Sequence, residues 1–98
     1  MAKRSIDAGV VTGAILWAPV GSATIHVRKI VVSCSSSTTV TVYHGTDTTA
    51  NRLLRGYFSA NQGCIVEFNK EEPCARGDTI YVTNVNATAS VTVYGLEF

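Results

Sequence analysis

The side chains of this sequence that could bind a metal or carry out acid–base chemistry are few and widely spaced. The chain contains two histidines, His26 and His44, and Asp47 lies close to the second of them. A metal site needs three or four convergent donors, and no spacing here resembles His-x-x-x-His or Cys-x-x-Cys. The hypothesis of a small hydrolase would require these groups to converge with a cysteine in one cleft. The sequence instead favours a protein without catalytic residues, metal or cofactor.

Three cysteines, Cys34, Cys64 and Cys74, are the remaining reactive side chains. They fall mostly at apolar strand positions or strand ends, where a thiol usually packs without reacting. An odd count fits a disulfide framework poorly, so buried free thiols are expected, with a Cys64–Cys74 bridge as the alternative. Nothing at the amino terminus resembles a secretory signal, and no apolar run approaches the roughly 20 residues that span a bilayer. These observations indicate a protein made in a cytosol-like compartment.

Charged residues make up only 15% of the 98 residues, and the formal net charge is +1. An average domain has about 25% charged residues. Thr, Ser and Asn take their place, which suits exposed strand faces and also protein interfaces, whose centres are depleted in charge. Basic residues form only small groups, at 3–4, at 28–29 and at 52 and 55. Such groups are too small to indicate nucleic-acid binding.

Trp17 and four tyrosines, Tyr43, Tyr57, Tyr81 and Tyr94, are candidates for recognition. They could form a stacking platform for carbohydrate or single-stranded nucleic acid, because Tyr43, Tyr81 and Tyr94 share the outward parity of their strands. Outward aromatic residues also pair across strands and anchor protein interfaces. The interface interpretation is favoured.

The tripeptide Arg76-Gly77-Asp78 matches a motif that adhesion receptors recognise. Gly-Asp before a strand is also ordinary turn chemistry, in which the Asp side chain bonds a backbone amide. Without indications of secretion, the turn interpretation is favoured.

Short runs rich in Val, Ile, Thr and Tyr alternate with Gly, Ser, Asn and Asp clusters, and this pattern predicts an all-β fold of about seven or eight strands. The expected architecture is an antiparallel β-sandwich of jelly-roll type, formed as a single domain by residues 10–98. Residues 1–9 are mostly polar and are expected to form an N-terminal arm. The expected strands are 10–18, 23–34, 38–43, 52–59, 64–68, 79–83 and 89–94, the last extended by 95–98.

Simple alternation does not determine the local structure of two segments, 23–34 and 52–59. In 23–34, Ile25 and Val27 lie on one parity, whereas the apolar residues from Ile30 onward lie on the other. A period of two cannot change phase without an extra residue, so a β-bulge or bend is expected near Arg28-Lys29. Segment 52–59 could also be a short helix, but a glycine in its middle favours a strand.

Five stretches from Trp17 onward carry a resemblance to a known family. They are APVG at 18–21 before a long strand, IVVSC at 30–34, TVTVY at 39–43, ARGDTIYV at 75–82 and SVTVYG at 90–95. Their order resembles that of small β-sandwich proteins in the virions of tailed bacteriophages. The resemblance implies a head decoration or cement protein, a jelly roll that binds the major capsid protein and itself as a homotrimer on the capsid surface. Alternatives are a tail- or neck-associated module, or a carbohydrate-binding module.

Contacts with other subunits are expected from the N-terminal arm, from loops 44–52 and 69–78, and from outward tyrosines. Burial of surface between neighbouring shell subunits would then stabilise the shell, since many weak sites add through repetition. The candidate interface residues are Lys3, Arg4, Ile6, Trp17, Tyr43, His44, Asp47, Arg52, Arg55, Tyr57, Arg76, Asp78, Tyr81 and Tyr94.

Overall fold

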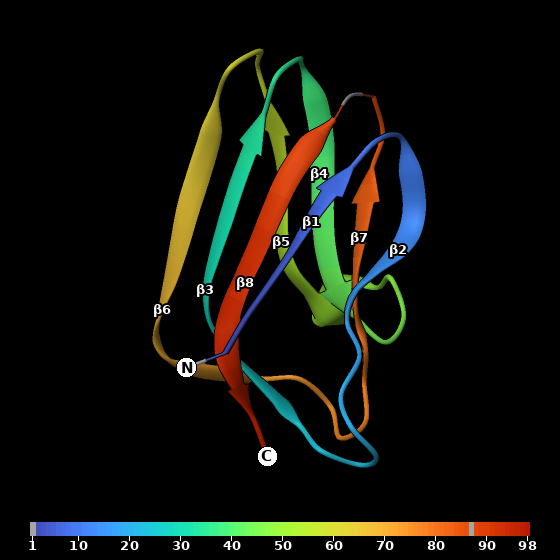
Figure 1. Ribbon diagram of the computed structural model, residues 1–98, viewed down its shortest axis with the longest axis vertical. Coiled ribbons are helices and arrows are strands. Elements are labelled where there is room, and N and C mark those ends of the chain that lie inside the picture. Colours follow the sequence, from blue (N-terminus) through green and yellow to red (C-terminus); the bar gives the residue numbers. More distant parts are fainter. Residues whose placement is uncertain (1, 87) are drawn as a thin grey trace.

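A computed structural model of the chain describes residues 2–86 and 88–98, without the side chains of residues 2, 8 and 69–73. Eight antiparallel strands form two four-stranded sheets that pack as a β-sandwich (Figure 1), which confirms the predicted all-β sandwich. No helix in the described part of the chain is long and apolar enough to cross a membrane. The elements are β1 (Ala2–Ala8), β2 (Val11–Trp17), β3 (Ile25–Cys34), β4 (Thr38–His44), the 3-10 helix η1 (Thr49–Asn51), β5 (Arg52–Phe58), β6 (Gly63–Pro73), β7 (Ile80–Asn84) and β8 (Ala89–Glu97).

The strands pair in a nested order along the chain. β1 pairs with β8, β2 with β7, β3 with β6 and β4 with β5. β8 also pairs with β3, and β7 with β4, so the first sheet has the order β1-β8-β3-β6 and the second β2-β7-β4-β5. Strands distant in sequence therefore lie side by side in both sheets.

The core lies between the sheets and is filled by the inward residues of the four central strands. Val32 of β3 and Val91 of β8 face Val42 of β4 and Val82 of β7, and each is at most 1% exposed. Fully burying such a side chain stabilises the fold by about 1.5–3 kcal/mol. The alternation read from the sequence therefore identified the core correctly.

The predicted bulge is confirmed at Arg28. The registers of β3 with β8 and with β6 both shift between Val27 and Lys29. Gly95 lies opposite this bulge, where a Cβ atom would collide with the carbonyl oxygen of His26. The bulge thus requires close approach of two backbones, which only glycine permits here.

The N-terminal segment differs from its predicted form as an arm outside the sandwich. Residues 2–8 are strand β1, whose register with β8 runs from Ala2–Gly95 to Ala8–Ala89, and Ile6 packs against the core. Backbone hydrogen bonds to β8 and one half-buried apolar residue together hold a segment whose composition is mostly polar. Met1 lies outside the described residues.

Burial on the outer side of β4 is greater than predicted. Tyr43 was expected to face outward, yet it is only 8% exposed, and Thr41 on the same side of β4 is 6% exposed. β4 is a central strand between β7 and β5, and longer side chains of these neighbours cover its outer positions. Parity gives the side to which a residue points, whereas the neighbours determine whether water reaches it.

One further prediction is confirmed, for segment 52–58, while strand β6 is longer than expected and the alternative disulfide is absent. Segment 52–58 is a strand, as favoured over a helix, with η1 immediately before it. β6 runs on to Pro73, so the expected loop 69–78 begins inside a strand, and the side chains of 69–73 lie outside the described set. Cys64 carries a free thiol, so the alternative bridge to Cys74 does not form. Burial raises the pKa of the Cys64 thiol.

Candidate functional site

The outer side of the second sheet exposes Ile15 and Tyr57 from its strands and Val85 just beyond β7. We call the outward side chains of β2, β7, β4 and β5 the tyrosine face. Its members are Ile15 from β2, Tyr81 and Thr83 from β7 with Val85 just beyond it, Thr39, Thr41 and Tyr43 from β4, and Arg52, Arg55 and Tyr57 from β5.

The strand register arranges this face in rows. Ile15 lies opposite Tyr81, Tyr81 opposite Tyr43, and Tyr43 opposite Arg52. The rings of Tyr43 and Tyr81 are stacked, with centroids 5.5 Å apart and planes inclined by 26°. The two rings therefore contact each other across the strands.

Exposure on the tyrosine face is greatest at its margins. Ile15 is 63% exposed, Tyr57 71% and Val85 59%, whereas Tyr43 is covered at the centre. Tyr57 and Val85 belong to one row, since Tyr57 pairs with Thr39 and the Val85 amide donates to the Thr39 carbonyl. Large apolar side chains held in water on a rigid sheet are typical of a surface that binds another protein.

The charged residues of the tyrosine face are arginines. Arg52 Nε donates to Asp47 Oδ1 at 3.0 Å, at the end of β5. Arg55 is exposed and forms no ion pair with any described side chain. The face therefore has an uncharged centre and a positive margin along β5.

The outer side of the first sheet has a different composition, and we call it the mixed face. Ser90 Oγ donates to Asp7 Oδ1 at 2.5 Å, and the Lys29 ammonium lies 4.7 Å from the Tyr94 ring centroid. Polar groups on this side are thus bonded to one another across strands. Its members are Lys3, Ser5, Asp7, His26, Lys29, Val31, Ser33, Ile65, Glu67, Ser90, Thr92, Tyr94 and Leu96.

The two faces separate the tyrosines that were considered as one platform. Tyr43 and Tyr81 lie on the second sheet and Tyr94 on the first, so the three rings do not share a surface. Trp17 is only 2% exposed. The alternative of a single stacking platform formed by these aromatic residues is therefore not realised.

Trp17 and Ile6 were also predicted as interface residues, and both point inward. Trp17 Nε1 donates to Glu97 Oε1 at 2.7 Å, and the Val20 amide donates to Glu97 Oε2 at 2.8 Å. The Arg4 guanidinium lies 5.1 Å from the centroid of the Trp17 ring. The bonds from Val20 and then from Trp17, with the charge of Arg4, lower the pKa of Glu97. These contacts link Trp17 of β2 to Arg4 of β1 and Glu97 of β8. Trp17 is therefore not available to a partner.

The loops at the lower end of the sandwich hold the remaining candidates (Figure 1). His44 Nδ1 and Asp78 Oδ2 are 2.9 Å apart, and the His44 and Asp78 side chains are 12% and 28% exposed. Arg76 Nε donates to the Ser22 carbonyl at 3.2 Å, which ties this loop to the β2–β3 loop. Both charged residues of the Arg-Gly-Asp tripeptide are thus engaged within the chain. The expected turn is present, with the Asp78 amide donating to the Ala75 carbonyl at 3.0 Å, but the Asp78 side chain bonds His44 and not the expected backbone amide.

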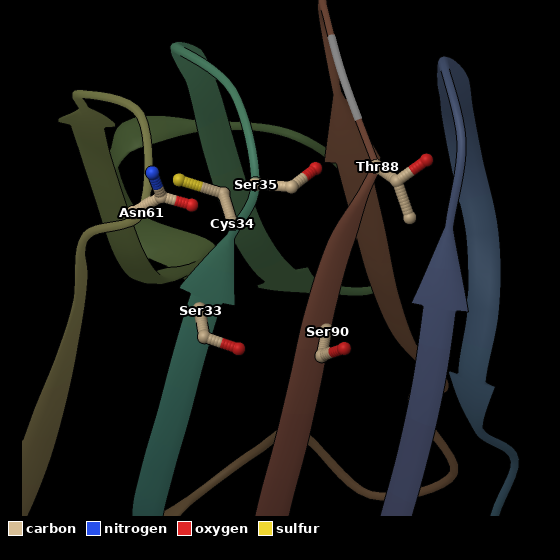
Figure 2. A pocket seen from close by; sticks show the side chains of 6 residues that line it. All are labelled: Ser33, Cys34, Ser35, Asn61, Thr88 and Ser90. Atoms are coloured by element: carbon tan, nitrogen blue, oxygen red, sulfur yellow. The ribbon is translucent and has the colours of Figure 1, made fainter.

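A polar hollow of ≈ 300 Å³ lies at the opposite end, where β3 ends and β8 begins (Figure 2). Cys34 Sγ points toward Asn61 and donates to the carbonyls of Ser59 and Gln62 at 3.4 and 3.3 Å. The thiol is therefore bonded to backbone, and no imidazole or carboxylate of a described residue bonds to it. The lining residues are Ser33, Cys34, Ser35, Asn61, Thr88 and Ser90.

The groups that were candidates for chemistry do not converge. His26 stacks on Phe98 in the first sheet, with ring centroids 4.0 Å apart, whereas His44 pairs with Asp78 in the lower loops. In residues 2–86 and 88–98, no three His, Cys, Asp or Glu residues are placed to hold a metal ion. The described side chains thus offer binding surfaces more clearly than a reaction centre.

No known family model matches this chain, and no curated protein or solved structure is significantly similar to it. The function is therefore inferred from the arrangement of these residues. Five of the predicted interface residues lie together on the tyrosine face, whereas Lys3 and Tyr94 lie on the mixed face. The sequence reasoning missed Ile15, the apolar member of the central row. The five residues are Tyr43, Arg52, Arg55, Tyr57 and Tyr81.

Proposed function

We propose that this chain is a structural protein that uses the tyrosine face to bind another protein surface. In this proposal it decorates and stabilises a bacteriophage capsid, as a homotrimer in contact with the major capsid protein. The observation that carries the binding role is the tyrosine face itself, with exposed Ile15, Tyr57 and Val85 around a stacked Tyr43–Tyr81 pair. The phage setting and the trimer rest on the sequence resemblance.

Residue types on the tyrosine face support a protein partner. Tyrosine and arginine are enriched in interfaces, and Lys, Glu and Asp are depleted there. Here tyrosine, arginine and threonine occupy most of the outward positions of β7, β4 and β5. The backbone of these rows is held by strand pairing, so binding would require no ordering of the backbone.

The size of the face supports attachment to a repeating lattice. Four strands spaced about 4.8 Å apart, with some five residues of about 3.4 Å each, give a flat patch on the order of 300 Å². A stable interface of two proteins buries about 800 Å² on each side. One copy would therefore bind weakly, whereas a trimer on a lattice would gain affinity because its sites bind together.

The strand order supports a jelly roll as the type of sandwich. Nested pairing of β1 with β8, β2 with β7, β3 with β6 and β4 with β5 is what results when one long antiparallel ribbon rolls into two sheets. Such a fold presents two broad sheet faces, and one of them is free to contact a shell while loops contact neighbouring copies.

The test is to isolate virions or induced particles of the phage or prophage that encodes the chain, and to measure its copy number by quantitative mass spectrometry. The proposal expects a fixed, high number of copies in tail-free heads. The mass of the purified protein is expected to be that of a trimer. A chain absent from the particles, or present only with tails, would contradict capsid decoration.

A further inference from the structure

The charges of the tyrosine face indicate the chemistry of the partner surface that would bind it. Arg55 projects from β5 beside the uncharged rows, and no described carboxylate pairs with it. Arg52 lies on the same strand and donates to Asp47. An arginine left at the margin of an interface is favourable only when the partner supplies an acceptor, and a carboxylate accepts two of its hydrogen bonds.

Among the described side chains, which do not include those of Glu71 and Glu72, a second copy of the chain offers no carboxylate that is both unbonded and on the tyrosine face. Asp47 is held by Arg52, Asp78 by His44, and Glu97 by Trp17 and Val20. Asp7 accepts from Ser90, and Glu67 lies opposite Lys29 on the mixed face. The described carboxylates are thus either bonded within the chain or located on the opposite sheet.

We infer that the tyrosine face docks onto an acidic protein surface, with carboxylates of the partner beside Arg55 and apolar groups over Ile15 and Tyr57. This inference rests on the proposed function and assigns its lattice contact to one face. Contacts between copies of the chain then use other surfaces. Charge at the rim would act chiefly on the association rate and on the salt dependence of binding.

The experiment uses the whole chain and particles from which it has been stripped, as in the copy-number test. Binding of wild type, Arg55→Glu and the control Lys3→Glu is measured by co-sedimentation at low and at high salt. Lys3 is exposed on the mixed face, so its reversal changes the net charge equally. Arg55→Glu is expected to weaken binding about tenfold or more at low salt, and less at high salt, because ions screen rim charges.

Each outcome decides a separate point. If wild type binds and Arg55→Glu binds equally well, or Lys3→Glu weakens binding as much, the inference is wrong while the proposed function stands. If wild type does not bind the stripped particles, both fail. The mass of Arg55→Glu must also remain that of the wild-type oligomer, since dissociation would show that the face joins copies of the chain.

Discussion

The two outer faces of this sandwich are built from equal numbers of strands, but they use their side chains differently. On the mixed face, polar groups pair with one another, as Asp7 does with Ser90 and Ser5 with Thr92. On the tyrosine face, Ile15 and Tyr57 are exposed to solvent, and Arg55 forms no ion pair with a described carboxylate. Both faces expose large apolar side chains, Ile65 and Leu96 on the first sheet and Ile15 and Tyr57 on the second. They differ in that the described polar groups of the mixed face bond across strands, whereas Arg55 of the tyrosine face has no described carboxylate partner.

This difference separates stability from binding. Changes to the contacts of the first sheet should reduce the free energy of unfolding. Changes to exposed groups of the tyrosine face should reduce binding and leave that free energy nearly unchanged. The following variants test this separation.

Deletion of residues 2–8 is expected to have the largest effect on stability. It removes the whole pairing of β1 with β8 and the packing of Ile6 against the core. The loss should be several kcal/mol, from lost hydrogen bonds and apolar burial. Urea unfolding followed by circular dichroism measures it, with Lys3→Ser as a control that keeps the strand. Equal midpoints for the deletion variant and wild type would mean that β1 is the dispensable arm that the sequence suggested.

Gly95→Ala is expected to destabilise the protein by about 1–3 kcal/mol or more, because overpacking forces the backbone to move. The added methyl would meet the His26 carbonyl and lie 3.3 Å from the Cα of Val27. Gly9→Ala is the matched control, since no heavy atom lies within 4 Å of its added Cβ. Thermal unfolding compares the two variants. A Gly95→Ala protein as stable as Gly9→Ala would contradict the close approach at the bulge.

Glu97 should make stability depend on pH in the acid range. Its pKa is lower in the folded protein than its ordinary value of 4.5, so it stabilises the fold above that value. This contribution is lost as the pH falls through the folded pKa, because the protonated group no longer holds Trp17 and Val20 as strongly. Glu97→Gln should be less stable than wild type near neutral pH and should lose less stability on acidification. Urea midpoints across this range, read from the fluorescence of Trp17, provide the measurement; parallel curves would refute the assignment.

The sequence predicted the fold where local patterns determine it. The change of phase between Val27 and Ile30 located the bulge, because side-chain alternation reports the register of a strand directly. It did not reveal β1, since Ile6 is the only large apolar residue between Lys3 and Asp7 and the pairing with β8 is a long-range contact. Buried Asn84, one residue beyond the expected strand 79–83, accepts a hydrogen bond from Thr38 at the edge of the core, which composition does not indicate.

The candidate site was also predicted in part. Tyr43, Tyr57 and Tyr81 were named from type and parity, but parity did not place Tyr94 on the other sheet. Ile15 was missed because the register of β2 shifts on both sides of it, between Val11 and Ala14 and between Ile15 and Trp17. Irregular pairing of this kind removes the alternation from which a face is read.

The central claim is that the tyrosine face binds a partner and the mixed face does not, and two isoleucines test it directly. Ile15 and Ile65 are 63% and 64% exposed on edge strands of the two sheets, so Ile15→Ser and Ile65→Ser remove similar surface and should each change stability by less than about 0.5 kcal/mol. In the particle-binding measurement, Ile15→Ser is expected to weaken binding about tenfold and Ile65→Ser by less than about twofold. Equal binding by the two variants, or a larger loss with Ile65→Ser, would contradict the account.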